Sequence, residues 1–550
     1  MLVLSTFLLT SCFHVKNQLY NPASTKPPKP PASVVRVFAD HDKPDPDCDP
    51  ADPGHNACLA FLEFDEMGEM WDPAQLEKAI GLIEKAKQVS THPIIVTFTH
   101  GWKNNARDEP GHVTGNVFGF EGILDYLENP TDQNRRPTHR FADSPVVGIY
   151  VAWRGDLVSK YWPVRRQLSY FNREGAAIRI PGASLTGALT RIMMVTHSGP
   201  PGARVIMVGH SFGGLVMERA LTQAMADFVL RGGTASPDVA AARMGLSPLD
   251  ITPEIKTAFS LSESRGVFVA GIEPGSVAAQ AGIELGDVIL QVGPDRTDSS
   301  KHLKTILAQA RVGDKLPVAA SRKGLGRTMT LEVTQGPDGA WADLVVFVNS
   351  AAAASEGKQM LDLLKNKGLE YSVTPEAKRL EAAETGRERT RERPLFLSIS
   401  SLGDIATRFG LFIGHGPSAV NRSFKGSWRT YDKPEPKEVP SQRSYYLSTT
   451  AHMPVLQSHL IVEDNPGGRA QCGPMFSDQP VTITTGQRYV ICEKPERWNE
   501  TPYWAMQMPA TIVPDHGGIF NQNFLALLLQ FLPTEAEMLN PNRMPALRFK

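Results

Sequence analysis

The sequence lacks both a long apolar run and a net charge of either sign. No apolar stretch reaches the roughly 18 residues that a membrane-spanning helix requires, so we predict that no helix crosses a membrane. The formal net charge of the 550 residues is −1, which gives no electrostatic footprint for a nucleic-acid partner. The composition, with 41% hydrophobic and 21% charged residues, is typical of a globular chain, and its length predicts two or three domains.

Cysteine is scarce as well, with five residues in the chain. Apart from Cys12 they fall into two local pairs, Cys48 with Cys58 and Cys472 with Cys492. Neither pair has the C-x-x-C spacing of a zinc site, so we expect no metal and no cofactor. Three pairings are possible, and proximity favours disulfides within each local pair in an oxidising compartment. The alternative is four unpaired thiols in a cytosolic enzyme.

The first residues form a short apolar run that ends in Leu9-Thr10-Ser11-Cys12. This ending resembles a bacterial lipobox, which implies a signal peptide over 1–12, lipidation of Cys12 and a membrane anchor in the cell envelope. The departure is that no lysine or arginine precedes the apolar run. The alternative is a buried strand that ends in an ordinary cysteine. Residues 13–57 are rich in proline and aspartate, which predicts an irregular tether.

The most informative motif is Gly209-His210-Ser211-Phe212-Gly213. An apolar, β-branched run at 205–208 precedes it, and a helix-forming stretch at 214–227 follows. The order strand, tight turn, helix predicts a nucleophile elbow, in which glycines permit a sharp turn that presents the serine Oγ. We therefore predict that Ser211 is a nucleophile.

A second motif predicts where negative charge on the substrate is stabilised. A buried-strand pattern at 94–98 leads into His100-Gly101-Trp102. A strand that ends in His-Gly is where a hydrolase with such an elbow places half of its oxyanion hole. We expect the backbone N–H groups of Trp102 and Phe212 to form this hole, and the His100 imidazole to be structural.

Two further residues fit the acid and base of a triad. Asp404 follows a buried strand at 394–399, whereas the rival Asp343 precedes its strand, at the wrong end of a sheet. His516 lies on a loop between the last predicted strand and a helix at 520–531. We predict that Asp404 orients His516, which takes the proton of the nucleophile.

The chain order serine, aspartate, histidine is that of one fold family. With the elbow and the His-Gly-Trp loop, it resembles α/β-hydrolase-fold serine esterases and lipases. The resemblance implies an α/β fold with a mostly parallel sheet flanked by helices, and hydrolysis of carboxylic esters through an acyl-enzyme. A serine peptidase of the same fold is the alternative, because the same machinery cleaves amides.

Four further motifs occur in order between the elbow and the next predicted strand: 265–269, 272–278, 281–282 and 285–290. Together they resemble a bacterial PDZ domain of the type found in HtrA periplasmic proteases, covering 244–334. The resemblance implies a small mixed α/β module that binds peptide C-termini. We expect Gly266, Val267 and Phe268 to supply amide groups for the terminal carboxylate and a strand edge.

These patterns divide the chain into a hydrolase with an insertion. We expect the hydrolase to consist of residues 58–243 and 335–550, with the PDZ insertion at 244–334 between them. Residues 410–510 are longer than a crossover needs and predict an accessory excursion. The expected partners are a small-molecule or lipid ester and a protein C-terminus. An envelope scaffold with an idle hydrolase is the non-enzymatic alternative, against which the complete triad argues.

Overall fold

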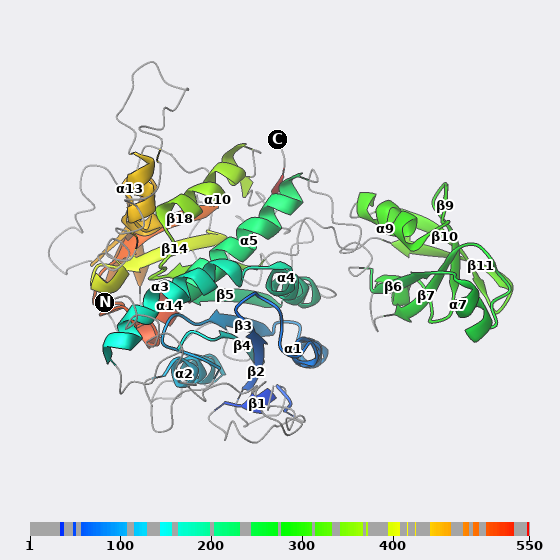
Figure 1. Cartoon of the computed structure of the whole chain (residues 1–550), viewed down its shortest axis with the longest axis horizontal. Helices are drawn as coiled ribbons and strands as arrows, with labels where there is room; N and C mark the ends of the chain where they lie inside the picture. The colour runs from blue at the N-terminus through cyan, green and yellow to red at the C-terminus, as the bar shows by residue number, and fades with distance from the viewer. Residues whose placement is uncertain are drawn as a thin grey trace, which may run out of the picture.

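The computed structural model contains a large α/β body and a smaller β-rich domain beside it (Figure 1). The residues that it describes are 34–37, 48–50, 57–106, 115–128, 144–156, 163–197, 203–230, 244–272, 277–310, 314–332, 342–366, 370–371, 394–407, 415, 424, 441–463, 477–482, 488–493, 502–532 and 547–548.

An eleven-stranded sheet forms the centre of the large body. In spatial order its strands are β1 (Val34–Arg36), β2 (Cys58–Phe64), β4 (Val146–Trp153), β3 (Ile94–Thr99), β5 (Arg204–His210), β12 (Leu344–Val348), β14 (Phe396–Ser401), β18 (Tyr503–Met508), β15 (His459–Glu463), β17 (Arg488–Glu493) and β16 (Ser477–Thr482). Neighbours are parallel from β2 to β15, whereas β1, β17 and β16 pair antiparallel at the two edges.

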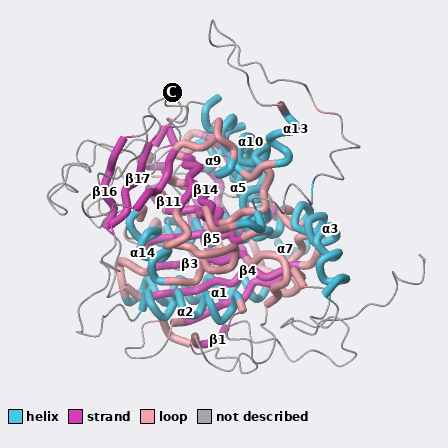
Figure 2. Tube along the Cα trace, turned by 90° about the vertical axis from the view of Figure 1, so that its left-hand side faces the viewer, coloured by secondary structure: helices cyan, strands magenta, loops and turns pink. Residues whose placement is uncertain are grey.

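Helices cover both faces of this sheet (Figure 2). Packed on one face are α1 (Ala74–Val89), α3 (Pro163–Arg179), α4 (Ala183–His197), α5 (Phe212–Leu230) and α10 (Ala354–Asn366). Packed on the other are α2 (Asn116–Glu128) and α14 (Gln522–Gln530). The remaining short elements of the body are α13 (Gln442–Leu447), a 3-10 turn at Thr450–His452, β13 (Glu370–Tyr371) and β19 (Leu547–Arg548).

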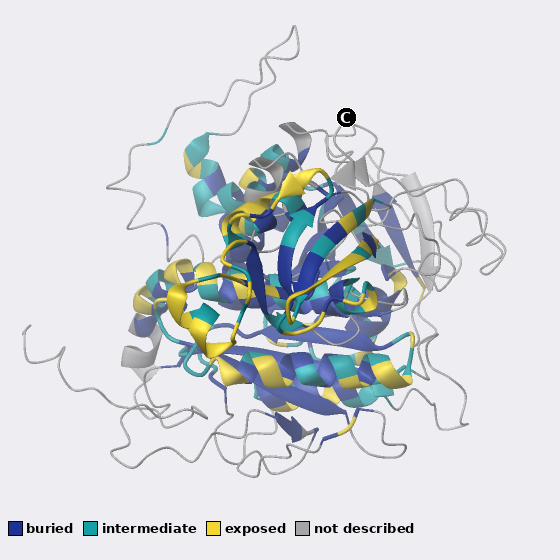
Figure 3. Ribbon diagram, turned by 90° about the vertical axis from the view of Figure 1, so that its right-hand side faces the viewer, coloured by how far each residue is buried: buried dark blue, intermediate teal, exposed yellow. Residues whose placement is uncertain are grey.

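The central strands are apolar along their length because both of their faces are buried. In β5, Val205 and Met207 face α4 and α5, whereas Ile206 and Val208 face α2 and α14. Side chains alternate between the faces of a strand, so each apolar residue adds to one of two cores. Figure 3 shows the buried strands of the central sheet, with exposed residues on the helices and on strands of the smaller domain.

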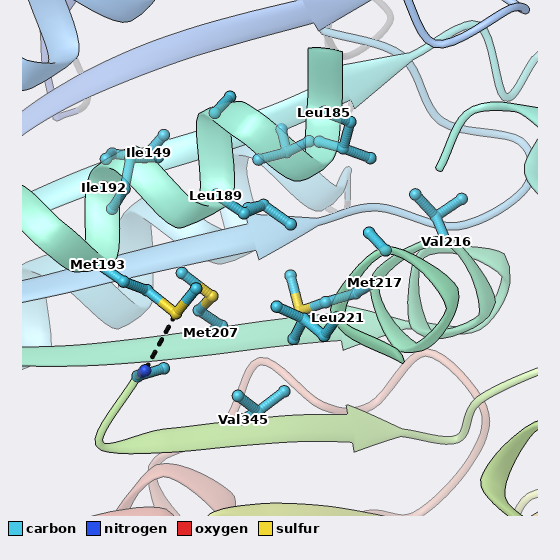
Figure 4. Packing of buried hydrophobic residues seen from close by; sticks show 14 of the residues in the cluster. Ile149, Leu185, Leu189, Ile192, Met193, Met207, Val216, Met217, Leu221 and Val345 are labelled. Atoms are coloured by element: carbon cyan, nitrogen blue, oxygen red, sulfur yellow. Dashed lines mark hydrogen bonds between the residues drawn. The ribbon is translucent and has the colours of Figure 1, made fainter. Parts of the chain in front are cut away.

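The core beneath α4 and α5 fixes the helix that starts at the elbow (Figure 4). Leu221 of α5 packs in the same cluster as Met193 of α4 and Met207 of β5. Burying one such side chain contributes about 1.5–3 kcal/mol to folding. The Met193 sulfur also accepts a hydrogen bond from the backbone N–H of Ala342 at 3.1 Å, where the chain re-enters the sheet.

The segment predicted to be an irregular tether contains an edge strand. β1 pairs antiparallel with β2, because Val34 and Val35 have apolar side chains that complete the two cores. A disulfide joins Cys48 to Cys58 at the start of β2. Cys492 is also disulfide-bonded, and its predicted partner Cys472 lies outside the described residues.

The expected lipidation site, Cys12, also lies outside the described residues. Within the described segments of the chain, no helix is long and apolar enough to cross a membrane. The excursion predicted at 410–510 includes α13 and strands β15, β16 and β17, which extend the main sheet beyond β18.

The smaller domain has its own sheet in the order β11-β10-β8-β7-β6, with β9 beside β8. Its elements are β6 (Leu246–Asp250), α7 (Pro253–Ala258), β7 (Val267–Ile272), α8 (Val277–Gln280), β8 (Val288–Val292), β9 (Asp295–Arg296), α9 (Ser300–Gln309), β10 (Lys315–Arg322) and β11 (Leu325–Glu332). One apolar cluster, with Val267, Ile289 and Leu303 among its members, forms the core, and it contains no residue of the large body.

Candidate active site

Ser211 occupies the turn between β5 and α5, with a left-handed φ of 57°. This conformation is strained for a non-glycine residue, and the surrounding backbone maintains it. The Ser211 N–H donates to the Val348 carbonyl at 3.3 Å, and the Ala351 N–H donates to the Ser211 carbonyl at 3.0 Å. A Cβ on Gly213 would lie 2.0 Å from the Thr99 oxygen, so only glycine fits there.

The structure brings Ser211, His516 and Asp404 into one hydrogen-bonded relay. The Ser211 hydroxyl donates to Nε2 of His516 at 2.9 Å, and Nδ1–H of His516 donates to Oδ1 of Asp404 at 3.0 Å. The serine and histidine are 305 positions apart in sequence, and the histidine and aspartate 112. They meet because parallel strands β5, β14 and β18 deliver the loops that follow them to one edge of the sheet.

Asp404 is fully buried and accepts hydrogen bonds from two residues. Burial alone would raise its pKa, but the hydrogen bond and charge of His516 and the hydrogen bonds of Thr407 outweigh burial and lower the pKa below its usual value. The Thr407 N–H donates to Oδ1 at 3.1 Å, and its hydroxyl donates to Oδ2. The carboxylate is thus ionised and fixed, as required of a group that orients a histidine.

Two backbone amides close to Ser211 have no hydrogen-bond acceptor among the described residues. Gly101 lies against Ser211, where a Cβ would come within 2.7 Å of the serine Cβ, so the backbone leading to Trp102 approaches closely. In the described segments of the chain, neither the Trp102 N–H nor the Phe212 N–H donates a hydrogen bond. These are the amides predicted to form an oxyanion hole.

The His100 imidazole belongs to the scaffold. Its Nδ1–H donates to the Gly101 carbonyl at 2.9 Å, and its Nε2 accepts from the Trp153 N–H at 3.1 Å. Burial lowers the pKa of His100 to about 4, so the ring is neutral and both nitrogens are used. The ring also stacks on the indole of Trp153.

Aromatic side chains line the approach to the elbow from α3. Tyr170 lies edge-on to Trp102, with ring centroids 5.4 Å apart, and packs on Phe212 at 5.0 Å. Trp102 also donates its indole N–H to the Ser169 hydroxyl at 3.0 Å. Helix α3 therefore contacts both Trp102 and Phe212.

Asp343, the rival acid, lies at the opposite end of the sheet. Its carboxylate accepts from the Val205 N–H at 2.8 Å, and this hydrogen bond joins the starts of β5 and β12. Nε2 of His197 lies 3.3 Å from the same carboxylate. Among the described residues, no group of three or more histidine, cysteine, aspartate or glutamate side chains is arranged to hold a metal ion.

Sequence reasoning missed two residues that touch the His516 main chain. Nε2–H of His210 donates to the His516 carbonyl at 2.7 Å, and the Asn349 amide donates to the same oxygen at 3.1 Å. Asn349 follows β12 as Asp404 follows β14, so the rule that found the acid could have found it. His210 stands within the elbow motif, but the motif does not indicate that its ring contacts the His516 carbonyl.

The predicted peptide-binding edge of the smaller domain requires correction. Strand β7 lies between two neighbours, and Val267 pairs with Asp250 of β6 on one side and Ile289 of β8 on the other. Phe268 is paired on both sides as well, so the prediction that this segment offers a strand edge is wrong. Gly266 serves the turn into β7, with a φ of 110°.

In the described sheet β6 is an edge strand, and β11 lies at the opposite edge. Gly245, with a φ of 73°, makes the turn into this strand, and α9 packs beside it. An edge strand next to a helix offers backbone groups and a groove to an extended peptide.

A PDZ domain family model matches residues 242–333. The chain is 26% identical over 221 residues to the periplasmic pH-dependent serine endoprotease DegQ of Escherichia coli, covering 40% of this chain and 44% of DegQ. It is 28% identical over 129 residues to the periplasmic serine endoprotease DegP of Salmonella typhimurium, covering 24% of this chain and 26% of DegP.

Two solved structures each match a small fraction of the chain. The HtrA-type protease AlgW with a decapeptide is 25% identical, with 20% of this chain and 33% of AlgW covered and a TM-score of 0.17. The HtrA3 PDZ domain bound to a phage-derived ligand is 21% identical, with 16% of this chain and 81% of that chain covered and a TM-score of 0.15.

The chain spans less than half the length of these two curated relatives. They favour the peptidase alternative over the esterase prediction, which they do not support. The chain is thus a mixed α/β protein that contains a PDZ domain at 242–333 and is similar, over a limited segment, to HtrA-type serine proteases.

Proposed function

We propose that the protein is a serine hydrolase that acts through Ser211, His516 and Asp404. The observation that carries the proposal is the continuous relay from the serine hydroxyl through both imidazole nitrogens to a buried, ionised carboxylate. A satisfied structural histidine does not require a strained serine at one nitrogen and a buried aspartate at the other.

In this mechanism the proton of the Ser211 hydroxyl passes to Nε2 of His516 while Oγ bonds to the substrate acyl carbon. Negative charge that develops on the acyl oxygen is stabilised by the amides of Trp102 and Phe212. The histidine then gives its proton to the leaving group, and the bond to that group breaks. Water, deprotonated by the same histidine, attacks the acyl-enzyme and releases the acid and the serine.

For the large body we propose an α/β-hydrolase architecture. It is supported by the mostly parallel sheet covered by helices on both faces, the elbow after a central strand and the triad order along the chain. The PDZ domain is then an insertion between α5 and β12 of this body.

For the bond that is cleaved we propose a peptide bond first and an ester second. The peptide bond is supported by the named activity of DegQ and DegP, which are serine endoproteases. The ester is supported by the resemblance of the elbow and the His-Gly-Trp loop to esterases. The relay itself serves either bond.

The PDZ domain is proposed to present substrates or partners by their C-termini. The β6 edge and the turn at Gly245 offer backbone groups that suit a strand ending in a carboxylate. We place this activity in the periplasm or elsewhere in the envelope, as the names of DegQ and DegP suggest. The proposal also includes lipid anchoring through Cys12.

A fluorophosphonate probe tests the proposal directly, because only an activated serine reacts with it. We expect labelling of the wild-type protein and none of Ser211→Ala. Hydrolysis is then compared on two substrates with the same acyl group, one an anilide and the other a phenyl ester. Cleavage of both supports the peptidase, and cleavage of the ester alone supports the esterase. An unlabelled wild-type protein would instead support a scaffold with an idle hydrolase.

A further inference from the structure

The backbone carbonyl of His516 is held by two buried side chains from different strand ends. Nε2 of His210 lies 2.7 Å from this oxygen, and Nδ2 of Asn349 lies 3.1 Å from it. His210 is 4% exposed and Asn349 is inaccessible. A carbonyl oxygen has two lone pairs, so these two donors use its full hydrogen-bonding capacity.

The partner of His210 determines which ring nitrogen carries the proton. A carbonyl only accepts, so Nε2 must be protonated, and Nδ1 has no hydrogen-bond partner among the described residues. Burial, and then the charge of the neighbouring His516, lower the pKa of His210 to about 3. The charged and titratable groups that face it are His516, Asp404 and His100. His210 is therefore a neutral donor at neutral pH.

Asn349 connects the histidine loop to the strand end that leads to the acid. Its amide nitrogen also donates to the Asp515 carbonyl at 3.3 Å, and its Oδ1 accepts from the Ser401 N–H at 2.9 Å. Its own N–H donates to the Ile399 carbonyl at 2.9 Å. One buried amide thus fixes the His516 loop relative to β14, three residues before Asp404.

The loop that carries His516 needs such anchors. Asp515 and Gly517 are exposed on either side of the histidine, and the His516 side chain itself is 30% exposed. The imidazole has to span Ser211 and Asp404 at the same time, with both hydrogen bonds near 3 Å. A displacement of about 1 Å at a reacting group can cost about a hundredfold in rate.

We propose that His210 and Asn349 are positioning residues that fix the His516 main chain so that its imidazole bridges nucleophile and acid. The proposal rests on the proposed hydrolase function. His210 directly precedes the nucleophile Ser211, and its side chain holds the main chain of the base His516. The elbow motif therefore links the position of the nucleophile to that of the base. Neither side chain contacts Ser211 Oγ or the Asp404 carboxylate through a hydrogen bond in the described structure.

The primary test compares His210→Leu with His210→Gln. Leucine fills similar space without a donor, whereas the glutamine amide nitrogen is as many bonds from Cα as Nε2 of histidine. We expect His210→Leu to lower kcat and the rate of probe labelling by about tenfold to a hundredfold, with KM within about twofold. His210→Gln recovers most of that loss.

His197→Leu is the matched control. It removes a histidine that pairs with Asp343 at the opposite end of the sheet, so it reports the general effect of this substitution on the body. We expect its kcat to equal that of the wild type. Normal kcat in His210→Leu, or a loss that His210→Gln does not recover, would overturn the role of His210.

Asn349→Gly tests the second donor while keeping a residue that accepts the observed φ of 45°. Either single variant leaves one donor on the His516 carbonyl. We therefore expect the double variant His210→Leu/Asn349→Gly to lose more activity than the product of the two single losses. A purely multiplicative loss would show that the two side chains do not share one task.

A spectroscopic measurement separates this proposal from the hydrolase proposal. With ¹⁵N-labelled histidine, the proton on Nδ1 of His516 reports its hydrogen bond to Asp404. We expect this resonance to shift in His210→Leu and to stay in place in His197→Leu. If the wild type has no hydrolase activity but the resonance shifts, the positioning proposal stands and the hydrolase proposal fails. If the protein is active and the resonance does not move, the positioning proposal fails.

Discussion

The large body and the PDZ domain hold their candidate sites in different ways. In the body, the serine and the histidine of the relay are 305 positions apart and meet only when the sheet is assembled. In the PDZ domain, the β6 edge and the turn at Gly245 belong to one short segment, and the proposed recognition uses its backbone groups. The proposed chemistry of the body therefore depends on packing between residues hundreds of positions apart, whereas the proposed groove of the PDZ domain is built from β6 and α9 within one small domain.

The same contrast explains where similarity to other proteins is found. The PDZ motifs follow one another within about a hundred residues and match a family model as a block. The motifs of the body are short and separated by long segments. The proposed function of the body therefore rests on the geometry of its site, because one fold can host many functions.

The largest expected effect belongs to the body. Ser211→Ala should lower hydrolysis about 10⁴-fold or more, because removal of a nucleophile leaves only the oxyanion donors and binding. The melting temperature should stay nearly unchanged, since the hydroxyl contributes one hydrogen bond and the backbone contacts of the elbow remain. Steady-state kinetics and calorimetry measure the two quantities.

Ser262→Ala, in the PDZ domain, is the control for this change. Its hydroxyl contacts Glu263, far along the chain from the relay. Hydrolysis should equal that of the wild type. Near-normal activity in Ser211→Ala would mean that the reactive group is not Ser211. The large body could then no longer be described as the reactive region and the PDZ domain as the recognition region.

Asp404→Asn should reduce kcat by about a hundredfold to ten-thousandfold, because an amide does not hold His516 in the required tautomer. The fall should be smaller than that of Ser211→Ala. Thr407→Val removes one hydroxyl donor to the same carboxylate and should cost only a few-fold. Equal losses in the two variants would show that Asp404 acts through packing and not through its charge.

Much of the relay could be predicted from sequence because each of its members follows a strand. Parallel strands place their carboxyl ends together, so the polar residues after β5, β14 and β18 had to be near one another. The prediction identifies the strand ends and the order of the relay, but not the side chains that hold the main chain of the His516 loop. That is why the contact of His210 with the His516 carbonyl was not foreseen.

Sheet order was the feature that the sequence did not reveal. The segment 267–268 was correctly predicted as a strand, but whether a strand is internal or at an edge depends on distant neighbours. Likewise, β1 lies in a region whose prolines and aspartates predict irregular structure. Its three residues pair with β2 because their apolar side chains are buried there. Local composition does not report such tertiary contacts.

Glu218 makes the stability of the large body depend on pH, which allows a further comparison with the PDZ domain. It is buried in α5, and burial raises its pKa to about 8, partly offset by the Tyr503 hydroxyl that donates to it. The unfolded chain releases this proton near 4.5, so between pH 4.5 and 8 the folded body holds more protons. The free energy of unfolding therefore falls as pH rises, by about 1.4 kcal/mol per pH unit.

Glu218→Gln removes this titration while keeping an oxygen that accepts from Tyr503. We expect the body of the variant to gain stability relative to wild type as pH rises from 5 to 8, while the PDZ transition is unchanged. Calorimetry at three pH values measures both. Glu77→Gln, at a side chain that is 60% exposed, is the control and should not alter the slope. Parallel curves for wild type and Glu218→Gln would contradict a protonated Glu218.

Deletion of the PDZ domain should have the smallest effect on the chemistry. Its apolar core contains no residue of the body, and none of Ser211, Asp404 and His516 lies within it. Replacing 244–332 by a short Gly/Ser linker should leave probe labelling and the cleavage of small substrates within about twofold, as tolerated insertions predict. Binding of peptides through their C-termini should be lost, and with it any preference for substrates that carry such a terminus. A folded deletion variant that no longer reacts with the probe would show that the PDZ domain helps to build the active site, so the two regions would be one functional unit.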